Sequence, residues 1–236
     1  MAEDILERLA RLDLTAVADD ISGLLANVGR GDTNPIGWHS FPAARTLTAN
    51  LWNAIETQPP AAEVDGWLSR AISSTAGRIA EFWANAIAAD WRAAGDNWTG
   101  LPPETRAELE GMLGCDDARC ALAEVVLSSR VLLLFGADRA WSEAHILPLL
   151  DWADPVRARR TWDGHLVRGR WNDQLLTAGL LEGYLAAADH IDEFRDEVRQ
   201  QLCMHLAAVA ISSEVDPLSG CISSRPPSTL LTGWSG

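Results

Sequence analysis

Apolar residues near the amino terminus recur mostly at steps of three and four, the spacing of one buried face of an α-helix. One step, from Leu12 to Val17, is five residues long and falls beside Thr15, a possible N-cap. The pattern therefore predicts two short helices, and Gly29 and Gly31 end it as C-cap residues would. The residues of the predicted buried face are Ile5, Leu9, Leu12, Val17, Ile21, Leu24 and Val28.

Further apolar stretches with helical spacing follow along the rest of the chain. They predict helices at about 43–57, 64–74, 76–93, 103–113, 118–135, 138–150, 154–168, 172–189 and 191–212. Pro155 directly follows Asp154, the order expected of an N-cap and the first helical position. No segment of comparable length alternates with period two. We therefore expect an all-α fold, either a multi-helix bundle or an irregular HEAT/TPR-like helical array.

The chain divides at loops rich in Gly and Pro. The stretches 29–42 and 95–103 interrupt the helical pattern. We expect an amino-terminal helical portion over 1–60, a main helical domain over 61–212, and a flexible Ser/Pro-rich tail over 213–236.

The net charge of the chain limits which partners it can bind. Among the 236 residues, 33 acidic residues outnumber 19 basic ones, all of them Arg, and the net charge is −14. An acidic chain repels phosphate, which argues against binding to nucleic acid or to an anionic membrane.

The longest apolar run, 131–137, is far shorter than the roughly 20 residues of a membrane-spanning helix, and the acidic amino terminus does not resemble a secretory signal. We expect a cytoplasmic protein.

Sequence motifs of catalysis and cofactor binding are missing. No two His residues stand at H-x-x-x-H spacing, and the sequence has no G-x-S-x-G nucleophile elbow and no Gly-rich phosphate loop. Because the chain has no Lys, Schiff-base chemistry and Walker-type lysines are excluded. We therefore expect a protein that is not an enzyme and carries no cofactor or metal.

The four Cys residues form no C-x-x-C pair, and they are too few for a disulfide scaffold in a chain of this length. We expect reduced and mostly buried thiols. Cys115 and Cys120 fit no common zinc spacing, so two half-buried thiols near a helix start are favoured over a metal site. Acid pairs such as Asp19 with Asp20 and Glu193 with Glu197 are expected on solvated helix faces.

One segment, 157–171, is basic within this acidic chain. Its arginines alternate with two tryptophans, so stacking of guanidinium on indole, or recognition of an anionic partner or nucleotide, is chemically possible. The residues of this candidate site are Arg157, Arg159, Arg160, Trp162, Arg168, Arg170 and Trp171. The favoured interpretation is internal ion pairing, because acidic residues follow on the next predicted helices. The expected partners are Glu182, Asp189, Asp192, Glu193 and Asp196.

Several sequence blocks resemble one bacterial family. These blocks are Ala76–Trp83, Leu133–Asp138, Leu147–Trp152, Trp162–Trp171, Cys203–Ile211 and Asp216–Leu218. They are similar to the helical region at the carboxyl end of sirtuin-like (SIR2-family) proteins, many of which are associated with defence against phage. The resemblance covers about 70–218, and the Ser/Pro-rich tail after it departs from the further helix that the family pattern implies.

The resemblance implies a function as well as a fold. In such proteins the sirtuin-like domain hydrolyses NAD, while the helical region senses or scaffolds. This chain has no dinucleotide-binding fingerprint. We therefore expect a non-catalytic protein-interaction or sensor module, with a sirtuin-like effector domain or a phage protein as its partner. The alternative is a helical domain that binds a small ligand or nucleotide through 157–171.

Overall fold

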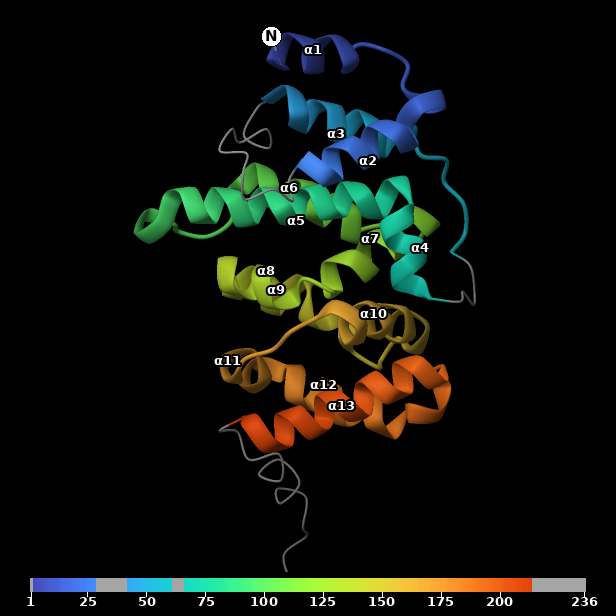
Figure 1. The fold of residues 1–236 in the computed structure, drawn as a ribbon, viewed down its shortest axis with the longest axis vertical. Coiled ribbons are helices and arrows are strands. Elements are labelled where there is room, and N and C mark those ends of the chain that lie inside the picture. The colour runs from blue at the N-terminus through green and yellow to red at the C-terminus, as the bar shows by residue number, and fades with distance from the viewer. Residues whose placement is uncertain (1, 29–41, 61–65, 214–236) are drawn as a thin grey trace, which may run out of the picture.

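The computed structural model describes residues 2–28, 42–60 and 66–213, and within these ranges it contains helices and no strand. The all-α prediction is confirmed. Figure 1 shows the helices stacked along the long axis of the molecule in nearly the order of the sequence, from α1 at one end to α13 at the other. The arrangement is thus an irregular multi-helix array, in which each level of helices packs on the next.

The amino-terminal level holds α1 (Ala2–Leu9), the short 3₁₀ helix Thr15–Val17, α2 (Ala18–Val28) and α3 (Pro42–Ala54). The predicted break is confirmed, and the Asp13 carboxylate accepts the Thr15 backbone N–H there at 3.1 Å. The predicted buried face is partly wrong. Four residues predicted to be buried are exposed, namely Ile5, Leu12, Val17 and Leu24. The residues buried in the core are instead their neighbours Leu6, Leu14 and Leu25. The two glycines expected to end this pattern lie outside the described residues, as does most of the loop 29–42.

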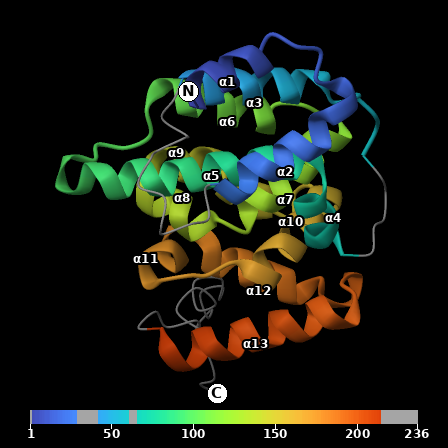
Figure 2. The ribbon, with the colours of Figure 1, turned by 45° about the horizontal axis from the view of Figure 1, so that its top comes forward.

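The second level is built around α5 (Thr75–Ala94), which packs against α2 on one side and α7 (Ala118–Ser128) on the other. The short α4 (Trp67–Ser73) precedes it, and α6 (Pro103–Leu113) lies between α5 and α7 in sequence. Figure 2 shows α5 crossing the molecule beneath α2.

The helix predicted over 118–135 is two helices, α7 and α8 (Val131–Ala137), bent by 76° at the break. The hydroxyl of Ser128 donates to the Val125 carbonyl at 2.9 Å, and that of Ser129 donates to Val126 at 2.7 Å. Such local side-chain bonds compete with the helical pattern, which explains why the helix ends here. No single described helix has the length and apolar character to cross a membrane, although α7 and α8 meet both criteria as a bent pair.

The remaining levels also contain more breaks than the sequence predicted. After α8 come α9 (Arg139–His145), the 3₁₀ helix Leu147–Leu150 and α10 (Pro155–Arg168), followed by α11 (Asp173–Leu175), the π-helix Leu176–Leu180, α12 (Leu181–Asp189), the 3₁₀ helix Ile191–Glu193 and α13 (Asp196–Ser212). Asp154 caps α10 as expected, accepting the Arg157 backbone N–H at 3.1 Å. In the π-helix, Gly179 has a φ of 125°, a conformation that favours glycine.

A single hydrophobic core runs through all levels, from Leu6 in α1 to Val209 in α13. Its largest fully buried side chains include Trp83, Trp162 and Tyr184. A close approach between α7 and α10 depends on Gly164, because a Cβ at that position would lie 2.2 Å from the Val125 carbonyl oxygen. The core thus connects the portions predicted as 1–60 and 61–212, while the predicted tail lies outside the described residues from 214 on.

Candidate functional site

Two arginines in the first half of α10, Arg157 and Arg160, turn inwards. Arg160 is 9% exposed, and its Nε and Nη2 lie 3.2 and 2.5 Å from Oε2 of Glu124 on α7, which is fully buried. The Nε of Arg157 lies 3.4 Å from Oε1 of the same carboxylate. Burial raises the pKa of Glu124, and the charge of Arg160 opposes that rise. These two arginines are therefore committed to an internal carboxylate.

The carboxyl end of α10 is held in the same way. Arg168 lies 3.4 Å from the buried carboxylate of Glu81 on α5, which also pairs with Arg130 at 3.1 Å. Arg159 faces outwards and lies 3.5 Å from Glu193. The favoured interpretation of this segment, internal pairing, thus describes four of its arginines.

The two tryptophans of the segment differ. Trp162 is fully buried and donates its indole N–H to the Leu150 carbonyl at 3.0 Å. Trp171 is half-buried against the core, and Arg170 beside it is exposed, with no ion pair to any other described residue. Only this end of the segment, Arg170 with Trp171, is left for an outside partner.

The predicted pairing partners were mostly wrong. Of the five acidic residues expected, only Glu193 pairs with an arginine of the segment, whereas Glu81 and Glu124 hold the others. Both lie on upstream helices, within runs that are otherwise apolar. A single acidic residue inside an apolar run could have indicated these partners, since a buried carboxylate needs a cationic group to pair with.

A second polar cluster joins three helices through histidines that the sequence did not pair. The Tyr184 hydroxyl on α12 lies 2.8 Å from Nε2 of His165 on α10 and 2.7 Å from Nδ1 of His205 on α13. Burial, with a contribution from His205, lowers the pKa of His165 to about 3, and burial also lowers the pKa of His205. Burial raises the pKa of Tyr184. All three groups are therefore neutral at pH 7. Their two hydrogen bonds link α13 to α12 and α10.

The expectation of reduced, buried thiols was wrong. Cys115, in the loop after α6, forms a disulfide with Cys120 in the first turn of α7, and Cys203 is exposed. Asp117 lies near both sulfurs, but its carboxylate caps α7 and lies 2.9 Å from Nε of Arg119. The two sulfurs are therefore bonded to each other and the Asp117 carboxylate is hydrogen-bonded, so these three residues are not free to bind a metal ion. Cys221 lies outside the described residues.

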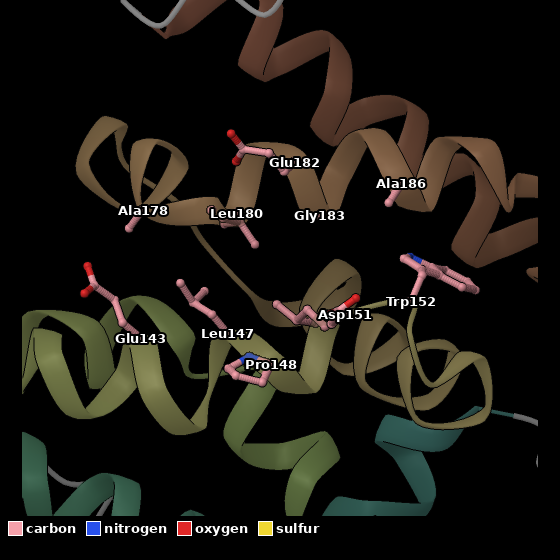
Figure 3. Close-up of a pocket in the computed structure, with 12 residues that line it drawn as sticks. Glu143, Leu147, Pro148, Asp151, Trp152, Ala178, Leu180, Glu182, Gly183 and Ala186 are labelled. Atoms are coloured by element: carbon pink, nitrogen blue, oxygen red, sulfur yellow. The ribbon is translucent and has the colours of Figure 1, made fainter. Parts of the chain in front are cut away.

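The surface is hollowed between two levels of the array. A cleft of about 420 Å³ lies between α9 and the 3₁₀ helix Leu147–Leu150 on one side and the π-helix with α12 on the other. Figure 3 shows these two sides facing each other across it. Its lining consists of Glu143, Leu147, Pro148, Leu150, Asp151, Trp152, Ala178, Gly179, Leu180, Glu182, Gly183 and Ala186. We call this hollow the acidic cleft.

Acidic groups rim an apolar floor in this cleft. Glu143 extends towards the gap near the Ala178 end, and Asp151 lies towards the end with Trp152, whereas the carboxylate of Glu182 lies on the side of α12 turned away from Leu147 (Figure 3). The leucines and the small residues of the π-helix and α12 supply apolar surface between them. The described lining residues include no Ser, Cys or His. The arrangement is suited to holding a ligand.

The sequence did not reveal this cleft. It forms where helices far apart in the chain meet, and where the π-helix changes the direction of the segment predicted as one helix over 172–189. The local signal was Gly179 beside Ala178 in a helical pattern, because glycine inside a helix often marks a break. π-helical turns are frequent at functional sites.

Comparisons with known proteins add no relative. No family model matches the chain, and neither curated proteins nor solved structures include a match to it.

Proposed function

We propose that this chain is a non-catalytic protein-interaction module, and that the acidic cleft binds a segment of the partner protein. The observation that carries the proposal is the cleft itself. Its volume of about 420 Å³ lies within the usual range of ligand sites, and its lining combines apolar surface with a few polar groups. The segment 157–171 is the weaker candidate, because Arg157, Arg160 and Arg168 already pair with buried carboxylates.

The resemblance of the helical blocks to sirtuin-associated regions supplies the first partners to test, a sirtuin-like effector domain and a phage protein. This part of the proposal rests on the sequence blocks alone. The site on the helical module does not depend on it.

Selection of peptides from a random displayed library tests the proposal. The full chain is the bait, and an Ala186→Trp variant, which fills the cleft beside Trp152, is the counter-bait. Leu185→Trp is the matched control, since Leu185 is the neighbouring residue of α12 but is exposed and does not line the cleft. A fold-checked Ala178→Leu variant fills the opposite end of the cleft.

We expect peptides that bind the wild type and the Leu185→Trp variant but neither cleft-filling variant. Peptides that bind all four proteins equally, or no enrichment over an unrelated bait, would refute binding in the cleft.

A further inference from the structure

We propose that the acidic cleft selects a basic side chain, Arg or Lys, presented by an extended segment of the partner. This inference rests on the proposed function and adds the chemistry of the partner. It follows from three independent features of the lining: the charges, the apolar floor and an indole N–H without an acceptor.

The first feature is an excess of negative charge without internal compensation. Among the described residues, Asp151 and Glu182 form no ion pair, and the Asp151 carboxylate only accepts the backbone N–H of Ala153. Glu143 pairs only with Arg139, at 2.7 Å, in an exposed contact with side chains 59% and 39% accessible. Exposed pairs of this kind contribute at most about 1 kcal/mol, so a ligand cation replaces this contact at little cost. An anionic ligand would meet the carboxylates of Glu143 and Asp151, and the charge of Glu182 on the outer side of α12 adds to the repulsion.

The second feature is the apolar floor between these carboxylates. Leu147 and Leu150 come from one side and Leu180 from the other, while Ala178 and Ala186 are too small to close the space. The aliphatic stem of Arg or Lys covers apolar surface while its charged end stays near the rim. A small inorganic cation has no stem and would leave this floor uncovered.

The third feature is Trp152. Trp152 is 9% exposed, and its indole stacks on His190 at a ring-centroid distance of 4.1 Å with nearly parallel planes. Its Nε1 is buried and has no hydrogen-bond acceptor among the described residues. A buried donor without a partner destabilises a structure by about 1–3 kcal/mol, so an acceptor supplied by a ligand binds favourably there.

The position of Trp152 decides the kind of ligand. It lies at the Asp151 end of the cleft, and Figure 3 draws the indole nitrogen on the side of the ring towards α12. A peptide brings a backbone carbonyl together with a basic side chain, which matches an N–H donor beside carboxylates. A polyamine brings the charge without the carbonyl.

The whole-chain charge favours the same partner. A net charge of −14 attracts cationic segments over long distances and speeds their association, an effect that salt weakens.

Binding of defined probes to the full chain tests the inference. The probes are a fluorescent peptide of alternating Leu and Arg, the same peptide with each Arg replaced by neutral citrulline, and spermine as competitor. The cleft variant combines Glu143→Gln, Asp151→Asn and Glu182→Gln, and Asn at 151 retains the acceptor for the Ala153 N–H, which lies 2.9 Å from Oδ1. The matched control combines Glu104→Gln, Asp189→Asn and Asp192→Asn, three exposed carboxylates outside the cleft whose removal changes the net charge equally.

We expect the Arg peptide to bind at least about tenfold more tightly than the citrulline peptide, a difference of about 1.4 kcal/mol. The cleft variant should lose that difference, and the control should keep it. In ¹⁵N spectra the Trp152 indole N–H, assigned with Trp152→Phe, should move downfield on binding as it gains an acceptor.

Each contrary result has its own meaning. If both peptides bind equally in the cleft, the basic side chain is refuted while the proposed function stands. If spermine matches the Arg peptide and the Trp152 signal does not move, the cleft takes a polyamine and the peptide inference is overturned. If the cleft and control variants weaken binding equally, only the overall charge attracts the probe, and the inference fails. If neither peptide binds and the library selection also gives no cleft-dependent binder, both proposals fail together.

Discussion

Glu124 is the residue whose neutralisation should affect this fold most directly. Its carboxylate is fully buried and pairs with Arg160, which is itself 9% exposed, and with Arg157. Glu124→Gln keeps the shape of the side chain but removes the charge. Two guanidinium groups then remain at a site built for a carboxylate, between the closely packed helices α7 and α10.

The expected loss follows from the burial of the pair. Removing one partner of a buried ion pair costs about 3–5 kcal/mol, whereas an exposed pair contributes about 1 kcal/mol or less. Domains are stable by about 5–15 kcal/mol, so Glu124→Gln should remove a large fraction of the stability. For a chain of this length, 2–4 °C per kcal/mol converts the loss to roughly 10 °C in Tm.

Urea unfolding followed by circular dichroism measures the loss, with an unchanged m-value as evidence that the folded state persists. Glu143→Gln is the matched control, because its pair with Arg139 has a similar distance of 2.7 Å but is exposed. The double variant Glu124→Met with Arg160→Met removes the buried pair, and it leaves Arg157, which is partly exposed and also lies 3.9 Å from Asp154, so it should recover most of the loss. A loss below about 1 kcal/mol for Glu124→Gln, equal to that of the control, would refute the reasoning.

Three further predictions concern packing, pH and ligands. Gly164→Ala should destabilise the protein by about 2 kcal/mol or more in urea unfolding, because its Cβ would overlap the Val125 carbonyl oxygen. Gly111→Ala, in a helix with open space around the new Cβ, should instead stabilise by about 0.5–1 kcal/mol, and equal effects would contradict the packing argument. His165 has a folded-state pKa of about 3, below the unfolded value of 6.5, so the unfolded chain binds its proton more readily. The contribution of neutral His165 to the free energy of unfolding is complete above pH 6.5 and is lost as the pH falls towards 3. At pH 5 the loss is about 2 kcal/mol. The stability difference between pH 7 and pH 5 should shrink by that amount in His165→Gln, and an unchanged difference would show that His165 is not the group responsible. NAD or ADP-ribose should leave Tm unchanged, since the arginines of 157–171 are largely paired internally. A ligand at 100 times its Kd adds about 2.7 kcal/mol, so a clear rise in Tm would restore the nucleotide-binding alternative.

The helical class was predictable because the period of the apolar residues is a local property. Capping was equally local, as Asp154 before Pro155 shows. Breaks inside apolar runs were not predicted. Ser128 and Ser129 end α7 through bonds to backbone carbonyls, and Gly179 interrupts the segment that leads to α12. Which of these small residues ends a helix depends on what packs around it.

The candidate site was predicted less well than the fold. Reasoning from the sequence identified the arginines of 157–171 and favoured internal pairing, but it assigned their partners to the helices that follow. The structure brings in Glu81 and Glu124 from upstream helices. Pairing between distant helices depends on their stacking order, which periodicity does not contain.

What the sequence determined by itself is the all-helical class, the acidic charge and the absence of the motifs of several kinds of enzyme. These depend on composition and on spacing within one helix. The tertiary structure alone decided which charges are buried, how His165, Tyr184 and His205 meet, and where the acidic cleft opens. The physical reason is that burial and clefts arise from the way helices distant in the chain pack together, and no local pattern records that packing.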